Sequence, residues 1–243
     1  MKQKIVQYLR KQSFQPTLAG ILVNPLFFVR RGIFIHIKML AAKQTGQLMD
    51  FGCGRKPYRN LFTHVTDYIG VDIEQTGHDH TNSQIDVFYD GKTLPFSADS
   101  FDAVFCSEVL EHVFNIDEVL PELSRVLKKD GQILITVPFC WNEHEIPYDF
   151  GRYTSFGIKH LLEKHGFSII EIHKSGHFSQ VISQFSSLYI YEVIKSAVKS
   201  KALHYLLSML LIVPINITGA IISFILPRNR SLFFNNVVLA RKN

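Results

Sequence analysis

Between residues 47 and 173, short apolar runs alternate with stretches of helical pattern, and this alternation restricts the possible folds more than any other feature. The runs with the length and character of buried strands are 47–51, 68–71, 101–106, 132–137 and 167–173, with a last one at 232–240. Helices are expected between them at 117–128 and 154–165. Repeated strand–helix–strand order predicts an α/β fold, a doubly wound and mostly parallel sheet with helices on both faces.

The composition is that of a globular chain. Hydrophobic residues make up 47% of the 243 residues and charged residues 19%, which is enough apolar material for a core. The net charge of +5 is small and dispersed, so no nucleic-acid partner is expected. Cys53, Cys106 and Cys140 are widely spaced, which argues against a disulfide framework and a structural zinc site and indicates a reducing, cytoplasmic setting.

The pattern divides the chain into four segments. Residues 1–45 form an N-terminal helical segment with a helix at 17–42, and residues 46–175 form the α/β core. Residues 176–230 form an apolar helical insertion, and residues 231–243 return the last strand to the sheet. Pro25 interrupts the apolar N-terminal stretch, and no small-residue cleavage site follows it, so a signal peptide is not expected.

The first expected strand ends in a glycine turn that contains Gly52 and Gly54. In doubly wound sheets, ligands bind outside the carboxyl ends of the strands, and glycines let the backbone approach them closely. Pro57 stands where a dinucleotide fingerprint has its third glycine, so a pyrophosphate ligand is not favoured. Asp72 ends the second strand, where a carboxylate can accept both hydroxyls of a ribose. A glycine turn by itself is more often only a turn.

Six motifs, in order, resemble the class I S-adenosylmethionine-dependent methyltransferases, in the branch that includes small-molecule and quinone methyltransferases. They are LMDFGCG at 48–54, GVD at 70–72, LPF at 94–96, SFDAV at 100–104, EVLEHV at 108–113, and RVLK at 125–128 followed by Gly131. The resemblance covers residues 46–175. It implies a Rossmann-like sheet of seven strands, here with a helical insertion before the last strand, and S-adenosylmethionine as the cofactor.

The resemblance also implies which residues contact the methionine part of the cofactor. Gly52 and Gly54 would pass under it, and Asp50 would lie near its amino group. Ser107 and Glu108, just after the strand at 101–106, would line the same side.

For the nucleoside part, the resemblance implies two carboxylates. Asp72 would hold the ribose, and Asp90, five residues before Pro95, matches the family's acidic residue that accepts from the adenine amino group. The segment 55–57 departs from the family, which often has a third glycine there, and this puts the shape of the loop in question.

Acceptor chemistry is expected in the loop 141–154, which resembles a His-Glu-x-Pro-x-Asp-Phe-x-Arg-Tyr-Thr segment of many bacterial members. Methyl transfer is an in-line displacement that depends on positioning, and a hydroxyl acceptor also benefits from a general base. His144 is the candidate base. The candidate acceptor contacts are Tyr148, Arg152, Tyr153 and His112. The alternative is that these side chains only brace the loop or are structural, and no metal site is expected.

Residues 205–226 form an uncharged, mostly apolar run of 22 residues, long enough to cross a bilayer. The family's sheet ends in a hairpin of the strands at 167–173 and 232–240, so both ends of the run must lie on one side of a membrane. Pro214 and Asn216 divide the run, which favours a helical hairpin that is re-entrant or lies on the membrane surface through 203–226. Basic flanks favour the cytoplasmic side. Packing within the protein or in a homodimer is the alternative.

Together these features predict an S-adenosylmethionine-dependent methyltransferase, cytoplasmic or peripheral on the inner face of the membrane. The expected acceptor is a small or lipid-linked amphiphilic molecule methylated at oxygen, such as a cell-surface glycan precursor or a quinone-like ring. The alternative from another class is a non-catalytic protein of the same fold that serves as a membrane-associated binding partner.

Overall fold

The computed structural model describes residues 2–73 and 83–243, with side chains from residue 6 onward. The chain divides into two compact units. The sheet unit consists of His36–His173 and Asn235–Asn243, and the helical unit consists of Met1–Ile35 and Lys174–Phe234. The N-terminal segment and the apolar insertion thus contribute to one unit, except that residues 36–45 belong with the sheet.

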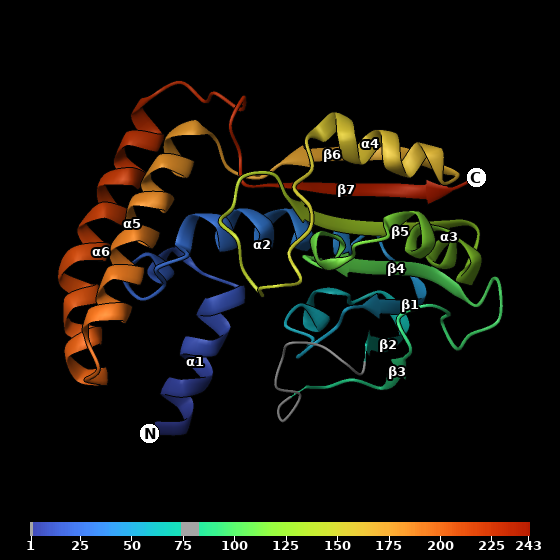
Figure 1. The fold of residues 1–243 in the computed structure, drawn as a ribbon, viewed down its shortest axis with the longest axis horizontal. Coiled ribbons are helices and arrows are strands. Elements are labelled where there is room, and N and C mark those ends of the chain that lie inside the picture. Colours follow the sequence, from blue (N-terminus) through green and yellow to red (C-terminus); the bar gives the residue numbers. More distant parts are fainter. Residues whose placement is uncertain (1, 74–82) are drawn as a thin grey trace. The chain divides into compact units, whose positions relative to one another are not determined.

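The described residues form one seven-stranded sheet, with strand order β3-β2-β1-β4-β5-β7-β6 (Figure 1). The strands are β1 Gly46–Phe51, β2 Val65–Ile73, β3 Val87–Tyr89, β4 Phe101–Ser107, β5 Leu127–Pro138, β6 Phe167–Lys174 and β7 Asn235–Lys242. Strands β3, β2, β1, β4 and β5 pair in parallel, and β7 pairs antiparallel with β5. The expected doubly wound sheet is confirmed, and its order reverses between β1 and β4, where ligands bind in such folds.

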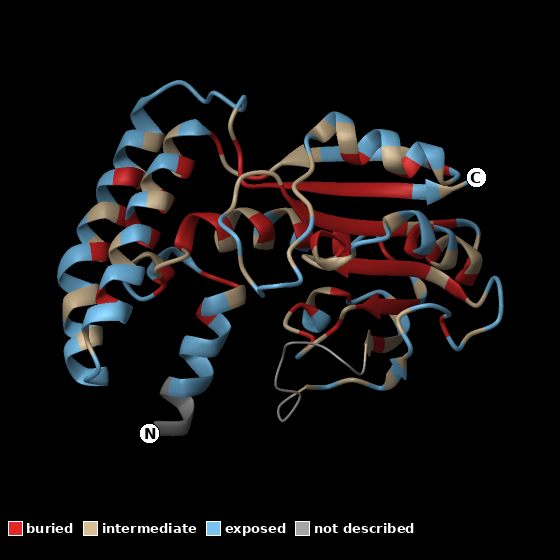
Figure 2. Cartoon of the chain, in the orientation of Figure 1, coloured by how far each residue is buried: buried red, intermediate tan, exposed pale blue. Residues whose placement is uncertain are grey.

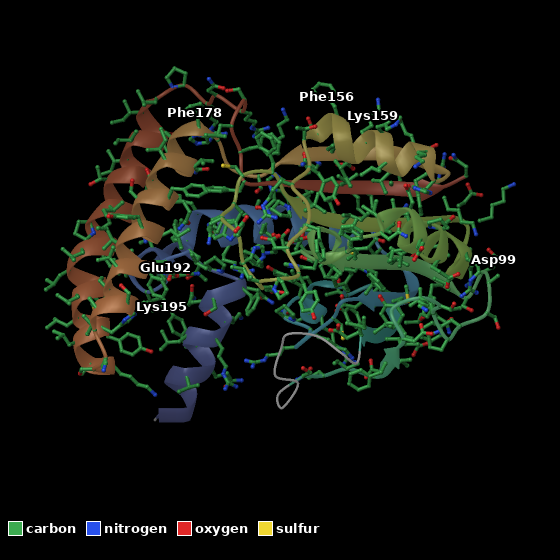
Figure 3. All side chains as sticks on the ribbon, viewed as in Figure 1. Asp99, Phe156, Lys159, Phe178, Glu192 and Lys195 are labelled. Atoms are coloured by element: carbon green, nitrogen blue, oxygen red, sulfur yellow. The ribbon has the colours of Figure 1, made fainter. Side chains whose placement is uncertain are left out.

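The centre of the sheet is the core of its unit, and Figure 2 shows β1, β4, β5 and β7 as mostly buried. Helix α3 (Ile116–Val126) buries Val119, Leu120, Leu123 and Val126, a stripe at helical spacing. Helix α4 (Ser155–Lys164) begins after Thr154, whose side chain accepts the N–H of Gly157 at 3.0 Å and caps the helix. The outer side of α4 carries the exposed Phe156 and Lys159 (Figure 3).

Two expected elements of the sheet unit differ from the structure. The helix expected to reach Lys128 ends at Val126, because the buried Leu127 already pairs with Phe101 as the first residue of β5. Lys128 therefore lies in a strand, where it forms an ion pair with Asp102 at 2.8 Å. Strand β3 has only three residues, too few for its apolar pattern to be recognised in the sequence.

The helical unit contains α1 (Lys2–Phe14), the short helix η1 (Leu18–Leu22), the first part of α2 (Phe27–Ala41), α5 (Phe178–Ala197) and α6 (Lys201–Ile225). The single helix expected at 17–42 is wrong, because the chain turns between η1 and α2. There the Asn24 side chain accepts the N–H of Leu26 at 2.8 Å, and Pro25 has no N–H to continue a helix.

The hairpin expected within 203–226 is also wrong, because α6 runs unbroken through Pro214. The helical hairpin of the structure is formed by α5 and α6, which lie side by side (Figure 1). Asn216 is buried, and its side chain accepts a hydrogen bond from the Ser187 hydroxyl at 2.8 Å. Contact with α5 therefore stabilises the helix where the proline weakens it.

Candidate cofactor and acceptor site

The glycine turn after β1 combines one closely packed position with one open position. Gly52 and Gly54 have φ values of 72° and 48°. A Cβ atom on Gly52 would lie 2.3 Å from the Val109 side chain, whereas one on Gly54 would meet no described atom within 4 Å. Gly52 therefore lets the turn pack against the segment after β4, and Gly54 leaves room for a ligand close to the backbone.

Asp72 lies beside this open glycine. Its Oδ2 accepts the N–H of Gly54 at 2.9 Å, and its Oδ1 accepts the N–H of Ile73 at 2.9 Å. The carboxylate is half-buried at the carboxyl end of β2. This position fits a ribose held next to the glycine turn, and the hydrogen bonds from Asp72 to the ribose stay a prediction.

Asp50 lies deeper, within β1. Its side chain is buried, and the Tyr68 hydroxyl donates a hydrogen bond to Oδ2 at 2.6 Å. Burial raises the pKa of Asp50 to about 7, although the hydrogen bond from Tyr68 acts in the opposite direction. A cationic amino group nearby would favour the ionised carboxylate, which is the partner that the methionine end of the cofactor requires.

The departure at 55–57 has a structural explanation. Lys56 is buried and forms an ion pair with Asp86, whose Oδ2 also accepts the N–H of Gly70 at 2.6 Å. A Cβ atom on Gly70 would lie 2.1 Å from the Lys56 side chain, so the lysine needs this glycine. The lysine thus fastens the turn to β2 in place of the missing glycine. The roles of Lys56 and Asp86 were not predicted from the sequence. The signal in the sequence was Gly70 of the GVD motif, which leaves room for the lysine side chain.

Asp90 is an exposed residue directly after β3. Its Oδ1 accepts the backbone N–H groups of Lys92 at 2.9 Å and Thr93 at 3.0 Å. These two hydrogen bonds lower the pKa of Asp90 and fix the turn that leads into the LPF motif. Contact with an adenine amino group stays a prediction for this residue.

Ser107 is the last residue of β4 and Glu108 follows it, next to the glycine turn. The Ser107 and Thr136 hydroxyls are 2.8 Å apart, and the Thr136 hydroxyl also donates to Glu108 Oε1 at 2.7 Å. Asn235 donates to Glu108 Oε2 at 2.7 Å. Glu108 has a positive φ of 55°, a conformation that such residues rarely adopt outside functional sites. Strands β5 and β7 thus hold Glu108 in a fixed orientation at the predicted methionine side.

The loop after β5 folds back over the short helix η4 (Leu110–His112). The Glu111 carbonyl accepts the N–H groups of Phe150 at 2.8 Å and Gly151 at 3.1 Å. His112 Nδ1 lies 2.6 Å from the carbonyl oxygen of Tyr148. These contacts place His144 against His112, with ring centroids 4.8 Å apart. The structure therefore brings the candidate base and one candidate acceptor contact together.

Arg152 and Asp149 form a paired brace within this loop. Both guanidinium Nη atoms donate to the Asp149 carboxylate at 2.6 Å, and this pairing lowers the pKa of Asp149. Arg152 also donates to the carbonyl oxygens of Gly151 at 2.7 Å and Asn142 at 2.9 Å. These contacts agree with the alternative that Arg152 braces the loop, and contact between Arg152 and an acceptor stays a prediction.

The two tyrosines of the loop lie in different surroundings. Tyr148 is exposed, whereas Tyr153 is half-buried and its hydroxyl donates to the Leu110 carbonyl at a long 3.4 Å. Burial raises the pKa of Tyr153. Tyr148 is thus the candidate contact that faces solvent, and Tyr153 is mainly packed against η4.

Glu111 is a site residue that the sequence analysis missed, although it lies within the EVLEHV motif. Its side chain is 0% exposed, and neither carboxylate oxygen has a hydrogen-bond partner among the described residues. Burial, with the nearby Glu108, raises the pKa of Glu111 well above its usual value. One ligand atom each of Glu111, His112 and His144 lie within 4.8 Å of one another.

The cofactor side and the acceptor side lie at the same sheet edge. Strands β1 and β4 end there side by side, with Phe51 paired to Cys106, and the side chain of Val109, the residue directly before η4, lies against Gly52. Residues 49–135, which contain both the glycine turn and η4, match the family model of a methyltransferase domain. The chain carries a class I S-adenosylmethionine-dependent methyltransferase domain. The cofactor of this domain is S-adenosylmethionine, as the resemblance predicted.

Known proteins with similar sequences and folds agree. The chain is 28% identical over 128 residues to the uncharacterized methyltransferase YcgJ of Bacillus subtilis, covering 47% of each protein. The chain spans about half the length, or less, of the curated relatives that it matches.

Solved structures show the same fold at low sequence identity. The S-adenosylmethionine-dependent methyltransferase of Mesorhizobium loti has a TM-score of 0.52 and 13% identity, covering 87% of this chain and 98% of that one. The [4+2]-cyclase SpnF has a TM-score of 0.55 and 18% identity, covering 100% and 97%. Because a cyclase shares it, the fold alone does not identify the reaction.

Proposed function

We propose that this protein transfers a methyl group from S-adenosylmethionine to a hydroxyl group of an amphiphilic, lipid-linked acceptor at a membrane surface. The methyltransferase domain supports the transfer, and the outward face of α6 carries the membrane part. Among the described helices, α6 has the length and mean hydropathy to cross a membrane, yet only 22% of its most apolar 18-residue stretch is buried in the protein.

Small and polar residues lie on the inner side of the α5–α6 hairpin. The Ser179 and Ser223 hydroxyls are 3.4 Å apart, and one turn further along α5 a Cβ atom on Gly219 would lie 2.5 Å from the Ser183 Cβ. The next turn places Asn216 against Ser187, as described above. Helices that pack through small and polar residues are typical of a membrane environment, where burying apolar side chains between helices brings no advantage.

Apolar residues lie on the outer side of α6, and the ends of the helix are basic. The exposed residues recur at helical spacing: Leu206, Met209, Leu210, Ile217, Ile221, Phe224 and Ile225. Lys195, Lys199 and Lys201 lie near the start of α6, and Arg228 and Arg230 follow its end. Lys195 forms an ion pair with Glu192, one turn earlier on α5, at 3.4 Å (Figure 3). An apolar face with basic ends fits the surface of an anionic bilayer.

The acceptor side supports transfer to oxygen. Burial, with the nearby His112, lowers the pKa of His144, so its imidazole is neutral near pH 7 and can accept a proton. The acceptor hydroxyl would lose its proton to His144 while its oxygen forms the bond to the methyl carbon. When bound, the cofactor would supply the electrophilic methyl group, and its S–CH₃ bond would break as the C–O bond forms. The role of the chain is to align the two reactants and keep water out.

Vesicle flotation tests the membrane part. The full chain is expected to float with vesicles of phosphatidylglycerol and phosphatidylethanolamine, and the Phe224→Glu variant is expected to remain in solution. Phe156→Glu is the matched control, because Phe156 is 81% and Phe224 is 91% exposed, on different units. Equal flotation of both variants would overturn the membrane part. The membrane part would also be overturned if the wild-type protein were a dimer that does not bind vesicles and that the Phe224→Glu substitution dissociates.

Transfer of a labelled methyl group tests the reaction. Cofactor carrying a labelled methyl group is added to the protein and a bacterial lipid extract, and label is expected in the organic phase. The Asp72→Ala variant should lose both transfer and binding of S-adenosylhomocysteine in calorimetric titration. Label found only in water-soluble products would contradict the lipid-linked acceptor and leave the methyltransferase itself in place.

A further inference from the structure

We infer that Glu111, His112 and His144 bind one divalent transition-metal ion on the acceptor side of the methyltransferase domain. No metal site was expected from the sequence, in which more than thirty residues separate His144 from the Glu111–His112 pair. The fold removes that separation by laying the loop after β5 onto η4. Binding of the ion stands on this geometry, and its role in catalysis rests on the proposed function.

The three side chains are close enough to share an ion. His112 Nε2 lies 3.9 Å from Glu111 Oε1, and the full set of ligand atoms falls within 4.8 Å. An ion bound at about 2.0–2.2 Å from each atom requires ligand atoms about 3.4 Å apart. The site therefore closes by a movement of roughly 1 Å, which the half-buried side chain of His144 can make from its loop.

Glu111 supplies the observation that points to a bound cation. Its carboxylate is fully buried and without a hydrogen-bond partner among the described residues. A buried carboxyl group without hydrogen bonds is costly, and a cation bound to it would offset that cost. The neighbouring Arg152 does not take that place, because its guanidinium nitrogens donate to Asp149 and to loop carbonyls.

Hydrogen bonds prepare both histidines as ligands. A carbonyl oxygen only accepts, so the short contact with Tyr148 places the proton of His112 on Nδ1 and leaves the lone pair on Nε2. His144 Nδ1 lies 3.3 Å from both the Asn142 carbonyl and the Asp149 carboxylate and 3.5 Å from the donor Arg152 Nη2. Because the two acceptors are nearer than the donor, they favour the proton on Nδ1 and leave Nε2 for an ion. Such carbonyl and carboxylate partners orient the histidine ligands of metal sites.

The ligand set indicates the class of ion. Two imidazoles and one carboxylate suit zinc, iron, manganese or cobalt better than magnesium or calcium, which prefer oxygen ligands. Three protein ligands also match catalytic zinc sites, which keep a fourth position open for water or substrate. Glu145 Oε2 lies 3.5 Å from His112 Nε2, at the edge of the cluster.

An ion in this site would change how the acceptor is activated. The acceptor hydroxyl would take the open position, and the ion would lower the pKa of that hydroxyl. Its proton would pass to solvent, and the S–CH₃ bond of the cofactor would break as the resulting alkoxide forms the bond to the methyl carbon. His144 would then be a ligand, and the proton-accepting role proposed for it above applies to the ion-free protein.

Titration with Co²⁺ tests binding without any need for activity. The full chain is first freed of metal with a chelator and is then expected to bind one equivalent of Co²⁺. Binding should give the visible absorption that is typical of cobalt with few ligands. Glu111→Gln and His144→Ala should each weaken binding by about 100-fold or more, since removal of an outer partner alone typically costs 10–100-fold. His173→Gln is the matched control, because His173 pairs with Glu171 at 2.9 Å in the same unit.

Binding of S-adenosylhomocysteine shows whether each variant is folded. His144 lies on a loop, so its variant remains informative if Glu111→Gln does not fold. Failure of the folded wild-type protein to bind Co²⁺, or equal binding by wild type and His144→Ala, would overturn the metal site. Methyl transfer at full rate by chelator-treated protein would overturn the catalytic role of the ion and leave the proposed function standing.

Discussion

The sheet unit and the helical unit distribute their apolar residues in opposite ways. The sheet unit buries Leu48, Val104 and Ile135 in the strands and directs its polar groups to loops and to the site. The α5–α6 hairpin buries four apolar side chains together with Ser187, Asn216 and Gly219, and it exposes most of its other large apolar side chains. The first arrangement is that of a protein folded in water, and the second is that of helices packed in lipid.

Truncation of an apolar side chain should therefore have opposite consequences in the two units. Ile135→Ala, in the centre of β5, is expected to lower the free energy of unfolding by about 2–5 kcal/mol, because it leaves a cavity in a closely packed core. Leu210→Ala, on the outer face of α6, should change it by less than about 0.5 kcal/mol in the absence of lipid.

Urea denaturation followed by circular dichroism measures both effects. With vesicles present, Leu210→Ala should weaken membrane binding, whereas Ile135→Ala should not do so under conditions where it remains folded. A loss of several kcal/mol from Leu210→Ala in water would mean that the outer face of α6 is covered by protein, and the comparison between the units would fail.

The sheet unit followed from the sequence to a greater degree than the helical unit. Strands β1, β4 and β6 have clear apolar runs ended by glycine or polar residues, and Thr154 marks the start of α4 by a local hydrogen bond. The path of α6 through Pro214 depends on Asn216 meeting Ser187, 29 residues earlier in the chain. The pattern of neighbouring residues in the sequence cannot predict a contact between residues so far apart in the chain.

The same distinction applies within the site. The glycine turn and Asp72 were found because their chemistry is local to a strand end, and their motifs are continuous in sequence. Glu111 was missed because its significance lies in being buried without a partner, which requires coordinates. Lys56 was missed because a lysine in a turn is normally solvated, and here Gly70 opens the space that buries it.

The buried polar contacts of the hairpin give a second, smaller prediction. Asn216→Leu should destabilise the helical unit by about 1–3 kcal/mol, because it leaves the Ser187 hydroxyl and the carbonyls of Ile21 and Asn24 without the amide. Ser208→Ala is the control, since the buried Ser208 hydroxyl has no partner among the described residues and its loss should be neutral or stabilising. Thermal denaturation of both variants measures these effects. If Asn216→Leu is as stable as the wild type, the buried polar contacts of Asn216 are not needed for the stability of the helical unit.

A further difference is that the buried polar groups of the α5–α6 hairpin and those of the sheet unit respond differently to pH. The hairpin buries serine and asparagine, which do not titrate, whereas the sheet unit buries Asp50, whose pKa is raised to about 7. The folded protein holds this proton over a range in which the unfolded chain, with an ordinary pKa of 3.8, has lost it. The contribution of Asp50 to stability is therefore present below about pH 4 and is lost as the pH rises toward 7.

Cofactor binding should show the reverse dependence on pH. The amino group of S-adenosylhomocysteine favours ionised Asp50, so affinity should rise about tenfold between pH 6 and pH 8, and binding below pH 7 should release a proton. Calorimetric titration in buffers of different ionisation enthalpy measures both quantities. In Asp50→Asn the affinity should be lower and nearly independent of pH over this range, because the group that titrates is gone. An unchanged pH dependence in that variant would place the titrating group elsewhere in the site, and Asp50 would then be a buried structural residue like those of the hairpin.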